Sequence, residues 1–389
     1  MAEWWRERQG GHPCEASHRP HLESTIGWLE RAQDATPDRG FARGYGLAWS
    51  RWFRRQGWQP SYPETTGYII PTFYQAAHHL SRPDLAERAT AAAQWEIEVQ
   101  LPSGAVPGGV IGEPVAPAVF NTGQVIFGWL AAHAVTGRTE FADAARRAGR
   151  YLVDMLEADG HWRTGNSLYA RPDTTLYNAR VAWALAEAGR ALDEPSFVDA
   201  AARNLRAVAA LQHANGWLPH CCLNDPERPL LHTLAYATRG LLEGGRVLED
   251  DRLVDSARRI AEALAERVRP DGWMAGRFDA NWSAAVRWSC LTGQAQMANN
   301  WIRFSLITGE THWLEPLPSV LRFLKGTQNR TSQNPALCGG IKGSYPIDGD
   351  YGRFELLNWA AKFFADALIR HERVLSGAAG DPAGGGHLA

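Results

Sequence analysis

The chain has 389 residues, 45% of them hydrophobic, which is enough for one large core or two ordinary domains. Its 40 Lys and Arg residues nearly cancel its 42 Asp and Glu residues, so the net charge is −2 and no basic field exists to hold a nucleic acid. No apolar run reaches the roughly 18 residues of a membrane helix. We therefore expect neither a nucleic-acid partner nor a membrane span.

The first residues, 1–11, carry charges and two Trp but no apolar segment of the kind found in signal peptides. Five cysteines are an odd number and do not indicate a disulfide framework, so we expect free thiols or a metal site. These features predict a cytoplasmic protein. We also predict a flexible tail at 1–18 and a disordered tail at 375–389, where Gly and Ala predominate.

Between the tails the sequence repeats with a period of about 56 residues. Similar amphipathic stretches open at Leu85, Phe141, Phe197 and Leu253, each 56 residues after the last. The glycines that follow these stretches keep the same interval: Gly104, Gly160, Gly216 and Gly272. Because glycine supplies the positive φ that a helix end or tight turn needs, each unit is predicted to be a pair of helices.

The two helices of each unit differ in composition. One set is rich in Ala, Gly and aromatic residues and is predicted to form an inner ring at about 64–80, 121–135, 176–191, 232–247, 291–308 and 353–370. The other set is amphipathic and rich in Arg and Glu, as expected of an outer ring at about 21–33, 84–100, 140–156, 197–212, 253–268 and 313–327. We therefore predict an all-α, single-domain (α/α)6 toroid over 19–374, since a closed ring buries every inner helix.

Several stretches carry a family resemblance, among them YPETTGYIIPT at 62–72, NGWLPHCCLND at 215–225 and the Gly-rich segment at 339–364. Together with the NG and TG turns, they resemble the six-hairpin glycosidase-like superfamily, which includes unsaturated glucuronyl hydrolases, N-acylglucosamine 2-epimerases and several lyases. The chain also looks like toroid proteins of exopolysaccharide and glycosylation gene clusters. The resemblance implies a site in the loops at one end of the ring, but toroids host many reactions.

Glu64, preceded by Tyr62, stands at the start of the first predicted inner helix. We expect Glu64 to be a general acid or base facing the axis and Tyr62 to contact substrate; the alternative is a carboxylate that stabilises the helix dipole. Asp279 is a second catalytic candidate, because Arg277 would keep it ionised. The alternative for that pair is an ordinary ion pair within a loop.

The longest connection, at 328–352, contains the densest group of polar residues. Its candidates are Lys342, Tyr345, Asp348, Asp350, Tyr351, Arg353 and Glu355. We expect Lys342, Tyr345 and Arg353 to bind substrate, while Asp350 and Tyr351 transfer protons. Equivalent repeat positions predict further inward-facing substrate contacts at Asn121, Gln124, Tyr177, Asn178, Arg180, Trp288 and Gln294.

A third cluster, containing His220, Cys221, Cys222, Asn224, Asp225 and His232, could provide a catalytic His220, a metal site or inert buried thiols. WSCLTG at 288–293 and LCGG at 337–340 resemble the zinc-binding segments of lanthionine cyclases, which would make Cys290, Cys338 and His220 zinc ligands. Gly339 replaces the histidine of that family. The Cys221–Cys222 doublet is similar to that of zinc-thiolate β-L-arabinofuranosidases, but Thr66 stands where that family has a cysteine.

These features predict a carbohydrate-active enzyme acting on a sugar or uronic-acid glycan by hydrolysis, elimination or epimerisation, without a cofactor, in polysaccharide metabolism or biosynthesis. A zinc-dependent cyclase or hydrolase is one alternative. A terpene-cyclase-like toroid is another, although the D-x-D-D motif expected of such an enzyme does not occur. A non-catalytic glycan-binding scaffold is the last. The 17 Trp residues suit either a large helical core or stacking on sugar rings. The sequence leaves the oligomeric state open.

Overall fold

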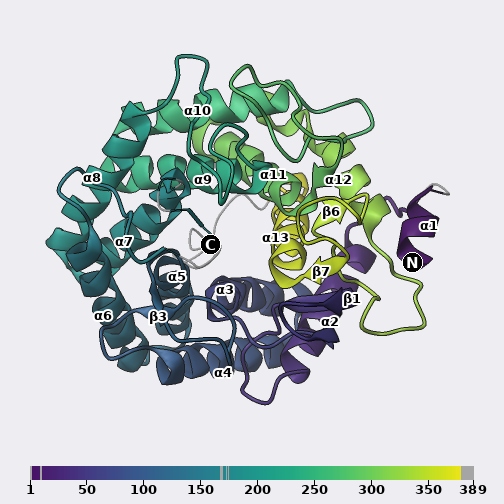
Figure 1. The fold of residues 1–389 in the computed structure, drawn as a ribbon, viewed down its shortest axis with the longest axis horizontal. Helices are drawn as coiled ribbons and strands as arrows, with labels where there is room; N and C mark the ends of the chain where they lie inside the picture. Colours follow the sequence, from purple (N-terminus) through teal and green to yellow (C-terminus); the bar gives the residue numbers. More distant parts are fainter. Residues whose placement is uncertain (1, 9–10, 167–169, 172, 174, 378–389) are drawn as a thin grey trace.

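The computed structural model describes residues 2–8, 11–166, 170–171, 173 and 175–377. Within them, six helices surround the axis of a ring and six more form an outer layer (Figure 1). The inner helices are α3 (Pro63–Leu80), α5 (Val119–Thr136), α7 (Ala179–Leu192), α9 (Leu231–Leu248), α11 (Leu291–Thr308) and α13 (Asn358–Leu375). The outer helices are α2 (Arg19–Asp34), α4 (Pro83–Val99), α6 (Thr139–Met155), α8 (Pro195–Ala210), α10 (Asp251–Ala265) and α12 (Leu317–Thr327). The predicted (α/α)6 toroid is confirmed.

The chain turns from inner to outer helix at left-handed residues that follow the repeat. These are Ser81, Gly137, Asp193, Glu249 and Gly309, with φ between 55° and 73°. The glycines after the outer helices, Gly104, Gly160, Gly216 and Gly272, also have positive φ, between 85° and 88°. The turn chemistry read from the sequence therefore operates in each of these units.

Tryptophan fills much of the space between the layers. Six of the 17 Trp side chains are among the largest fully buried ones: Trp28, Trp129, Trp162, Trp183, Trp301 and Trp313. Their indole N–H groups are not left without partners; that of Trp301, for example, donates to the Ala261 carbonyl at 3.0 Å. The Trp excess thus serves the core to a large extent.

Short strands accompany the loops at the end of the ring where the inner helices begin. The largest sheet has the antiparallel order β2 (Arg55–Trp58), β1 (Gly44–Ser50), β7 (Glu355–Leu357). Two-stranded pairs join β3 (Val106–Pro107) to β4 (Pro117–Ala118) and β5 (Ser289–Cys290) to β6 (Ser344–Tyr345). The pairing of β7 with β1 explains why the last inner helix begins at Asn358, five residues later than predicted.

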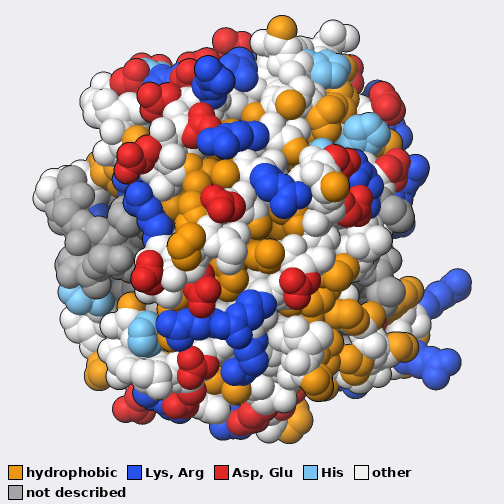
Figure 2. Space-filling view, turned by 90° about the vertical axis from the view of Figure 1, so that its left-hand side faces the viewer, with side chains coloured by type: hydrophobic (Ala, Val, Ile, Leu, Met, Phe, Trp, Pro, Cys, Tyr) orange, Lys and Arg blue, Asp and Glu red, His pale blue; other side chains and the backbone are white. Residues whose placement is uncertain are grey.

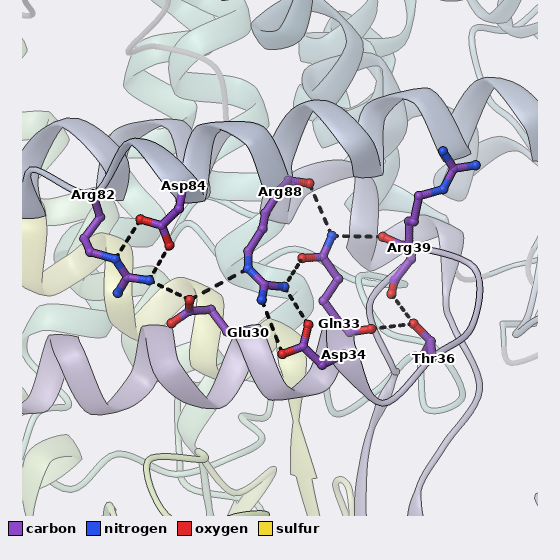
Figure 3. A network of polar contacts seen from close by, with 9 residues as sticks. Glu30, Gln33, Asp34, Thr36, Arg39, Arg82, Asp84 and Arg88 are labelled. Carbon is purple, nitrogen blue, oxygen red and sulfur yellow. Dashed lines mark hydrogen bonds and ion pairs between the residues drawn. The ribbon is translucent and has the colours of Figure 1, made fainter.

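The ring closes where α2, from the start of the chain, packs against α13. Figure 3 shows the polar contacts between α2 and α4: Arg82 binds Glu30 at 2.7 Å, and Arg88 binds Asp34 at 2.7 Å. The Gln33 amide donates to the backbone carbonyls of Arg39 and Arg88. The links from α2 to Arg82 and to Arg88 of α4 join residues 52 to 55 positions apart, so they fix the outer layer where the first and last units meet.

The N-terminal segment, predicted as part of a flexible tail, contains helix α1 (Ala2–Arg8) on the outside of the ring (Figure 1). Glu3 and Glu7 of this helix are buried, and both bind Lys342 Nζ, at 3.2 and 2.8 Å. An isolated helix of this length is unstable in water, so α1 depends on this contact.

Acidic and basic side chains alternate over the flank of the ring in Figure 2, with apolar atoms between them. The outer layer carries ion pairs such as Arg206 with Asp250 and Arg258 with Glu310. Among the residues that the structure describes, no helix combines the length and hydropathy needed to cross a membrane.

Candidate active site

The inner helices present chemically active side chains at the end where they begin. Glu64 lies in the first turn of α3, Asn121 in that of α5, Arg180 in that of α7 and His232 in that of α9. Tyr351 arrives from the Gly-rich loop that precedes β7. Because all inner helices start at the same end of the ring, these side chains share one region around the axis.

Glu64 is partly exposed at this end of the ring. The Tyr62 hydroxyl donates a hydrogen bond to Glu64 Oε2 at 2.5 Å. Burial raises the pKa of Glu64 to about 7, against the opposing effects of the Tyr62 hydrogen bond and the positive charges of Arg43 and Arg180. The carboxyl can therefore both hold and release a proton near neutral pH, as a general acid or base must.

Tyrosines line the surroundings of Glu64. Burial raises the pKa values of Tyr68, Tyr177 and Tyr236, and the negative charge of Glu64 raises each further. All three phenols stay protonated and can donate hydrogen bonds. The Phe120 ring lies 5.0 Å from that of Tyr177 and 5.1 Å from that of Tyr236, which extends the aromatic wall.

His232 and Tyr351 form a second acid–base group. Their ring centres are 5.4 Å apart. His232 Nδ1 lies 2.7 Å from Gln296 Oε1, and since an amide oxygen only accepts, Nδ1 carries the proton and Nε2 is the basic nitrogen. Burial lowers the pKa of His232 to about 3, which keeps the ring neutral. The Tyr351 hydroxyl accepts a hydrogen bond from Trp359 Nε1 at 2.8 Å.

Arg180 is the cation of the site and is only 1% exposed. Its Nε donates to Gln124 Oε1 at 2.7 Å, and its guanidinium carbon lies 5.0 Å from the ring centres of both Phe127 and Tyr236. The nearby Asn178 amide is fully buried, and neither its nitrogen nor its oxygen has a hydrogen-bond partner among the described residues. A buried amide without partners is what a polar ligand would satisfy.

The β1–β2 hairpin forms the rim of the site. Arg43, just before β1, lies between two aromatic rings, 4.9 Å from the Trp359 centre and 5.2 Å from that of Phe53, and it binds Glu355 at 3.0 Å. Trp49 and Trp52, near the hairpin tip, are 66% and 62% exposed.

Comparison with known proteins bears on this architecture. No family model matches the sequence, and no curated protein sequence matches it either. Among solved structures, an unsaturated glucuronyl hydrolase specific for heparin aligns with a TM-score of 0.71 and 14% identity, over 92% of this chain and 97% of that one. A sugar epimerase from a ruminal bacterium aligns with a TM-score of 0.70 and 15% identity, over 91% and 97%.

Cellobiose 2-epimerase from Bacillus thermoamylovorans aligns with a TM-score of 0.66 and 11% identity, covering 95% of this chain and 98% of that one. The fold is the six-hairpin (α/α)6 toroid. The fold that the sequence resemblance implied is thereby confirmed, while identities this low establish the fold alone.

Only some of the site residues predicted in the Gly-rich loop lie near the axis of the ring. Tyr351 lies in the site, but Lys342 is buried against α1, Asp348 accepts a hydrogen bond from Trp4 Nε1 at 3.0 Å, and the Tyr345 ring packs 5.4 Å from that of Phe323. Asp350 and Arg353 are exposed. The partners of three of these side chains come from α1 and α12, outside the site.

The Asp279 carboxylate accepts hydrogen bonds from the backbone N–H groups of Asn281 and Ser283, both at 2.9 Å, and so holds its own turn. Arg277 binds Cys222 Sγ at 3.1 Å and Asn224 Oδ1 at 3.0 Å instead of Asp279.

Several other residues that were predicted to contact substrate form hydrogen bonds or packing contacts within the protein. Gln294 donates to the Gly272 carbonyl at 2.6 Å, and Asn121 donates to that of Pro107 at 3.1 Å. The half-buried Trp288 packs over Gly276 and Gly349.

The cysteines are free thiols, and the described residues contain no group of three His, Cys, Asp or Glu side chains that could hold a metal ion. Cys338 Sγ donates to the Arg330 carbonyl, and His220 lies in a loop with φ 54°. Burial raises the pKa of Cys290 to about 12, so this thiol stays protonated. Cys290, Cys338 and His220 do not come together as such a group in this structure.

Sequence reasoning assigned no role at the site to Tyr68, Tyr236 or Trp359. A signal for the first two was present in the repeat, because Tyr68, Gln124, Arg180 and Tyr236 are each 56 residues apart. These four equivalent positions meet around the Arg180 guanidinium, which lies 6.0 Å from the Tyr68 ring centre. The register of the repeat thus identifies side chains that converge on the axis.

Proposed function

We propose that this chain is an enzyme that acts on a sugar or a uronic-acid-containing glycan, with Glu64 as its principal proton-transferring group. The observation that carries the proposal is the carboxyl of Glu64, whose pKa is about 7, in a wall of buried tyrosines beside Arg180. Aromatic walls of this kind stack against sugar rings.

The cations of the site suit an acidic sugar. Arg43 and Arg180 both act electrostatically on Glu64, so a ligand carboxylate bound beside Glu64 would feel both charges. The unpartnered Asn178 amide offers a donor and an acceptor to sugar hydroxyls. The names of the aligned structures, a glucuronyl hydrolase and two epimerases, describe enzymes of sugars and support the same substrate class.

Proton transfer at carbon suits this set of residues better than hydrolysis by two carboxyl groups. Glycosidases of the common type use a pair of carboxyl groups, whereas the charges that act on Glu64 come from Arg43 and Arg180 and not from a second acid. A uronate carboxylate beside these cations has a more acidic α-hydrogen. Glu64 would remove that hydrogen as a proton, leaving its electron pair delocalised into the carboxylate.

The resulting enolate has two outcomes. A proton returned to the opposite face, with Tyr351 as a candidate donor, gives epimerisation. Expulsion of the substituent on the adjacent carbon, whose oxygen takes up a proton, gives elimination and a new carbon–carbon double bond. The free thiols support a reducing compartment such as the cytoplasm for this reaction.

The test incubates the purified chain with glucuronate- and iduronate-containing oligosaccharides, polygalacturonate and cellobiose in D2O. Deuterium at a sugar carbon reports proton exchange, ultraviolet absorbance reports a new double bond, and reducing-end release reports hydrolysis. We expect exchange or double-bond formation, and a loss of about 10²- to 10⁴-fold in Glu64→Gln. Glu98→Gln, at an exposed position of α4, is the matched control.

Three results would count against the proposal. Wild-type turnover by Glu64→Gln removes Glu64 from the mechanism. Release of reducing ends without carbon-bound deuterium or a double bond replaces proton transfer at carbon with hydrolysis. Absence of turnover on every member of the panel rejects this substrate class.

A further inference from the structure

The segment that contains the β1–β2 hairpin carries a local excess of positive charge. Residues 39–63 contain no Asp or Glu, in a chain whose overall net charge is −2. Arg39 binds Glu98 at 2.6 Å, and Arg43 binds Glu355 at 3.0 Å. The remaining arginines of the segment are Arg51, Arg54 and Arg55, which all lie at the hairpin tip.

These three arginines face solvent without an acidic partner. Arg51, Arg54 and Arg55 are exposed, and within the described residues none of them forms an ion pair. The Arg55 guanidinium donates to the backbone carbonyl of Trp58 at 3.3 Å, which does not offset its charge. The hairpin tip is therefore a cationic surface that is open to an anionic ligand.

Large apolar side chains accompany these charges. Trp49 and Trp52 of the tip are 66% and 62% exposed. The Trp52 indole N–H donates to the carboxylate of Glu113, which anchors the tip to the loop at 108–116. That loop adds Ile111 and Val115, which are 37% and 69% exposed. Aromatic rings and guanidinium groups thus share one exposed surface.

This surface is continuous with the candidate active site. Figure 1 shows β1 beside β7, near α3 and α13. Arg43 lies 5.2 Å from the ring centre of Phe53, next to the tip, and its charge also acts on Glu64. The loop at 108–116 bonds through its backbone to Ser61, three residues before Glu64, at 2.9 Å. Both parts of the surface therefore adjoin the start of α3.

We propose that the tip of the β1–β2 hairpin, with the loop at 108–116, binds the part of a uronate-containing glycan chain that extends beyond the active site. A Trp ring stacks against the apolar face of a sugar, and an Arg guanidinium pairs with the carboxylate of a uronate. The choice of a uronate rests on the proposed function. The inference adds that the substrate is a chain of several sugars and not a free sugar.

Two other partners bind surfaces of Arg and Trp, and both suit this hairpin less well. Attraction to anionic membranes generally takes clusters of about four to eight cations, more than the three exposed arginines of the tip. Nucleic-acid binding is typical of basic domains, whereas this chain has a net charge of −2.

The test measures binding by titration calorimetry, with the parent chain and with Glu64→Gln, so that turnover does not consume the ligand. The probes are disaccharides and octasaccharides of galacturonate and of hyaluronan, with isomaltooctaose as the neutral chain. We expect at least one acidic octasaccharide to bind roughly tenfold more tightly than its disaccharide, and added salt to weaken that binding. Equal affinities for the two lengths, or equal binding of the neutral chain, would overturn the inference.

The result is independent of the catalytic proposal. Turnover of short acidic sugars without a preference for longer chains would overturn only the role of the hairpin. Length-dependent binding without turnover of any substrate would support the hairpin and reject the proposed enzyme.

Two variants localise the binding. Trp49→Ala should lower the affinity for the octasaccharide about tenfold, towards that for the disaccharide. The combined variant Arg51→Gln, Arg54→Gln and Arg55→Gln should lower it as well and remove most of the salt dependence.

The matched controls lie on the outside of the ring. They are Trp5→Ala on α1, where the side chain is 56% exposed, and Arg190→Gln, whose guanidinium binds Glu249. Both should bind the octasaccharide as the parent does. Parental affinity in Trp49→Ala would overturn the inference, and so would tighter binding of phosphatidylglycerol vesicles or single-stranded DNA than of the octasaccharides.

Discussion

The Tyr62 hydroxyl donates to Glu64 Oε2 at 2.5 Å, and this hydrogen bond opposes the effect of burial on the Glu64 carboxyl. Burial favours the protonated acid, while the phenol stabilises the carboxylate. The two residues are adjacent to the same helix start, because Tyr62 is the N-cap and Glu64 the second residue of α3. The hydrogen bond between these two neighbouring residues therefore helps to determine the pKa of the Glu64 carboxyl.

Tyr62→Phe is expected to raise the pKa of Glu64 above about 7. A hydrogen bond worth about 0.5–1.5 kcal/mol corresponds to a shift of roughly 0.4–1 pH unit in the inflection of the activity profile. The pH dependence of kcat/KM checks this. Tyr151→Phe, on an outer helix, serves as the control. An inflection that stays in place or moves to lower pH would contradict the assignment of this titration to Glu64.

Glu64→Gln is expected to stabilise the fold at pH 8. The pKa of Glu64 is about 7 in the folded chain and 4.5 without the fold, so between these pH values the folded state binds more protons and stability falls as pH rises. The variant lacks this penalty. Its gain at pH 8 should be on the order of 1–3 kcal/mol, discounted for the partial exposure of Glu64.

Denaturant unfolding at pH 8 and pH 4.5 measures this difference. The gain should be small at the lower pH, where Glu64 is protonated in the folded state and half protonated in the unfolded state. Glu98→Gln, on the exposed side of α4, provides the comparison. A Glu64→Gln variant that is less stable than the parent at pH 8 would refute the pKa argument.

Lys342→Met should destabilise the fold by about 3–5 kcal/mol, because it removes the cation that the buried carboxylate of Glu7 binds and one of the partners of Glu3. Adding Glu3→Gln and Glu7→Gln should restore part of the loss. Chemical denaturation gives the stability, and turnover per folded molecule should remain at the parent value. A raised KM with unchanged stability would instead support the substrate contact expected from the sequence.

Much of the fold could be predicted because the information is local and repeated. Turn glycines and amphipathic stretches recur at 56 residues, and the helices begin within a few residues of their predicted positions in most units. The last inner helix is the exception, since Glu355–Leu357 pairs with Gly44–Gly46, a contact between opposite ends of the chain. Composition alone does not reveal such a pairing.

The repeat also predicts where some of the candidate site residues lie. Glu64, Tyr177, Arg180 and Tyr351 lie around the axis because the repeat register brings helix starts together. Lys342 has a polar, Gly-rich context that suits ligand binding equally well, but its partners are Glu3 and Glu7, from a segment whose composition indicated no fixed structure. The Asp279 carboxylate likewise accepts hydrogen bonds from the backbone N–H groups of the residues two and four positions later in the chain.

The packing of α2 against α13 has a consequence for how the protein is made. Ribosomal synthesis delivers α2 before the rest of the ring and α13 last, so the contact that completes the ring spans more than 300 residues of sequence. Until α13 emerges, the nascent chain is an open arc whose apolar inner faces lack their final partner. Glu64 and Tyr351 come from opposite sides of that gap, so catalytic competence should appear only when the arc closes.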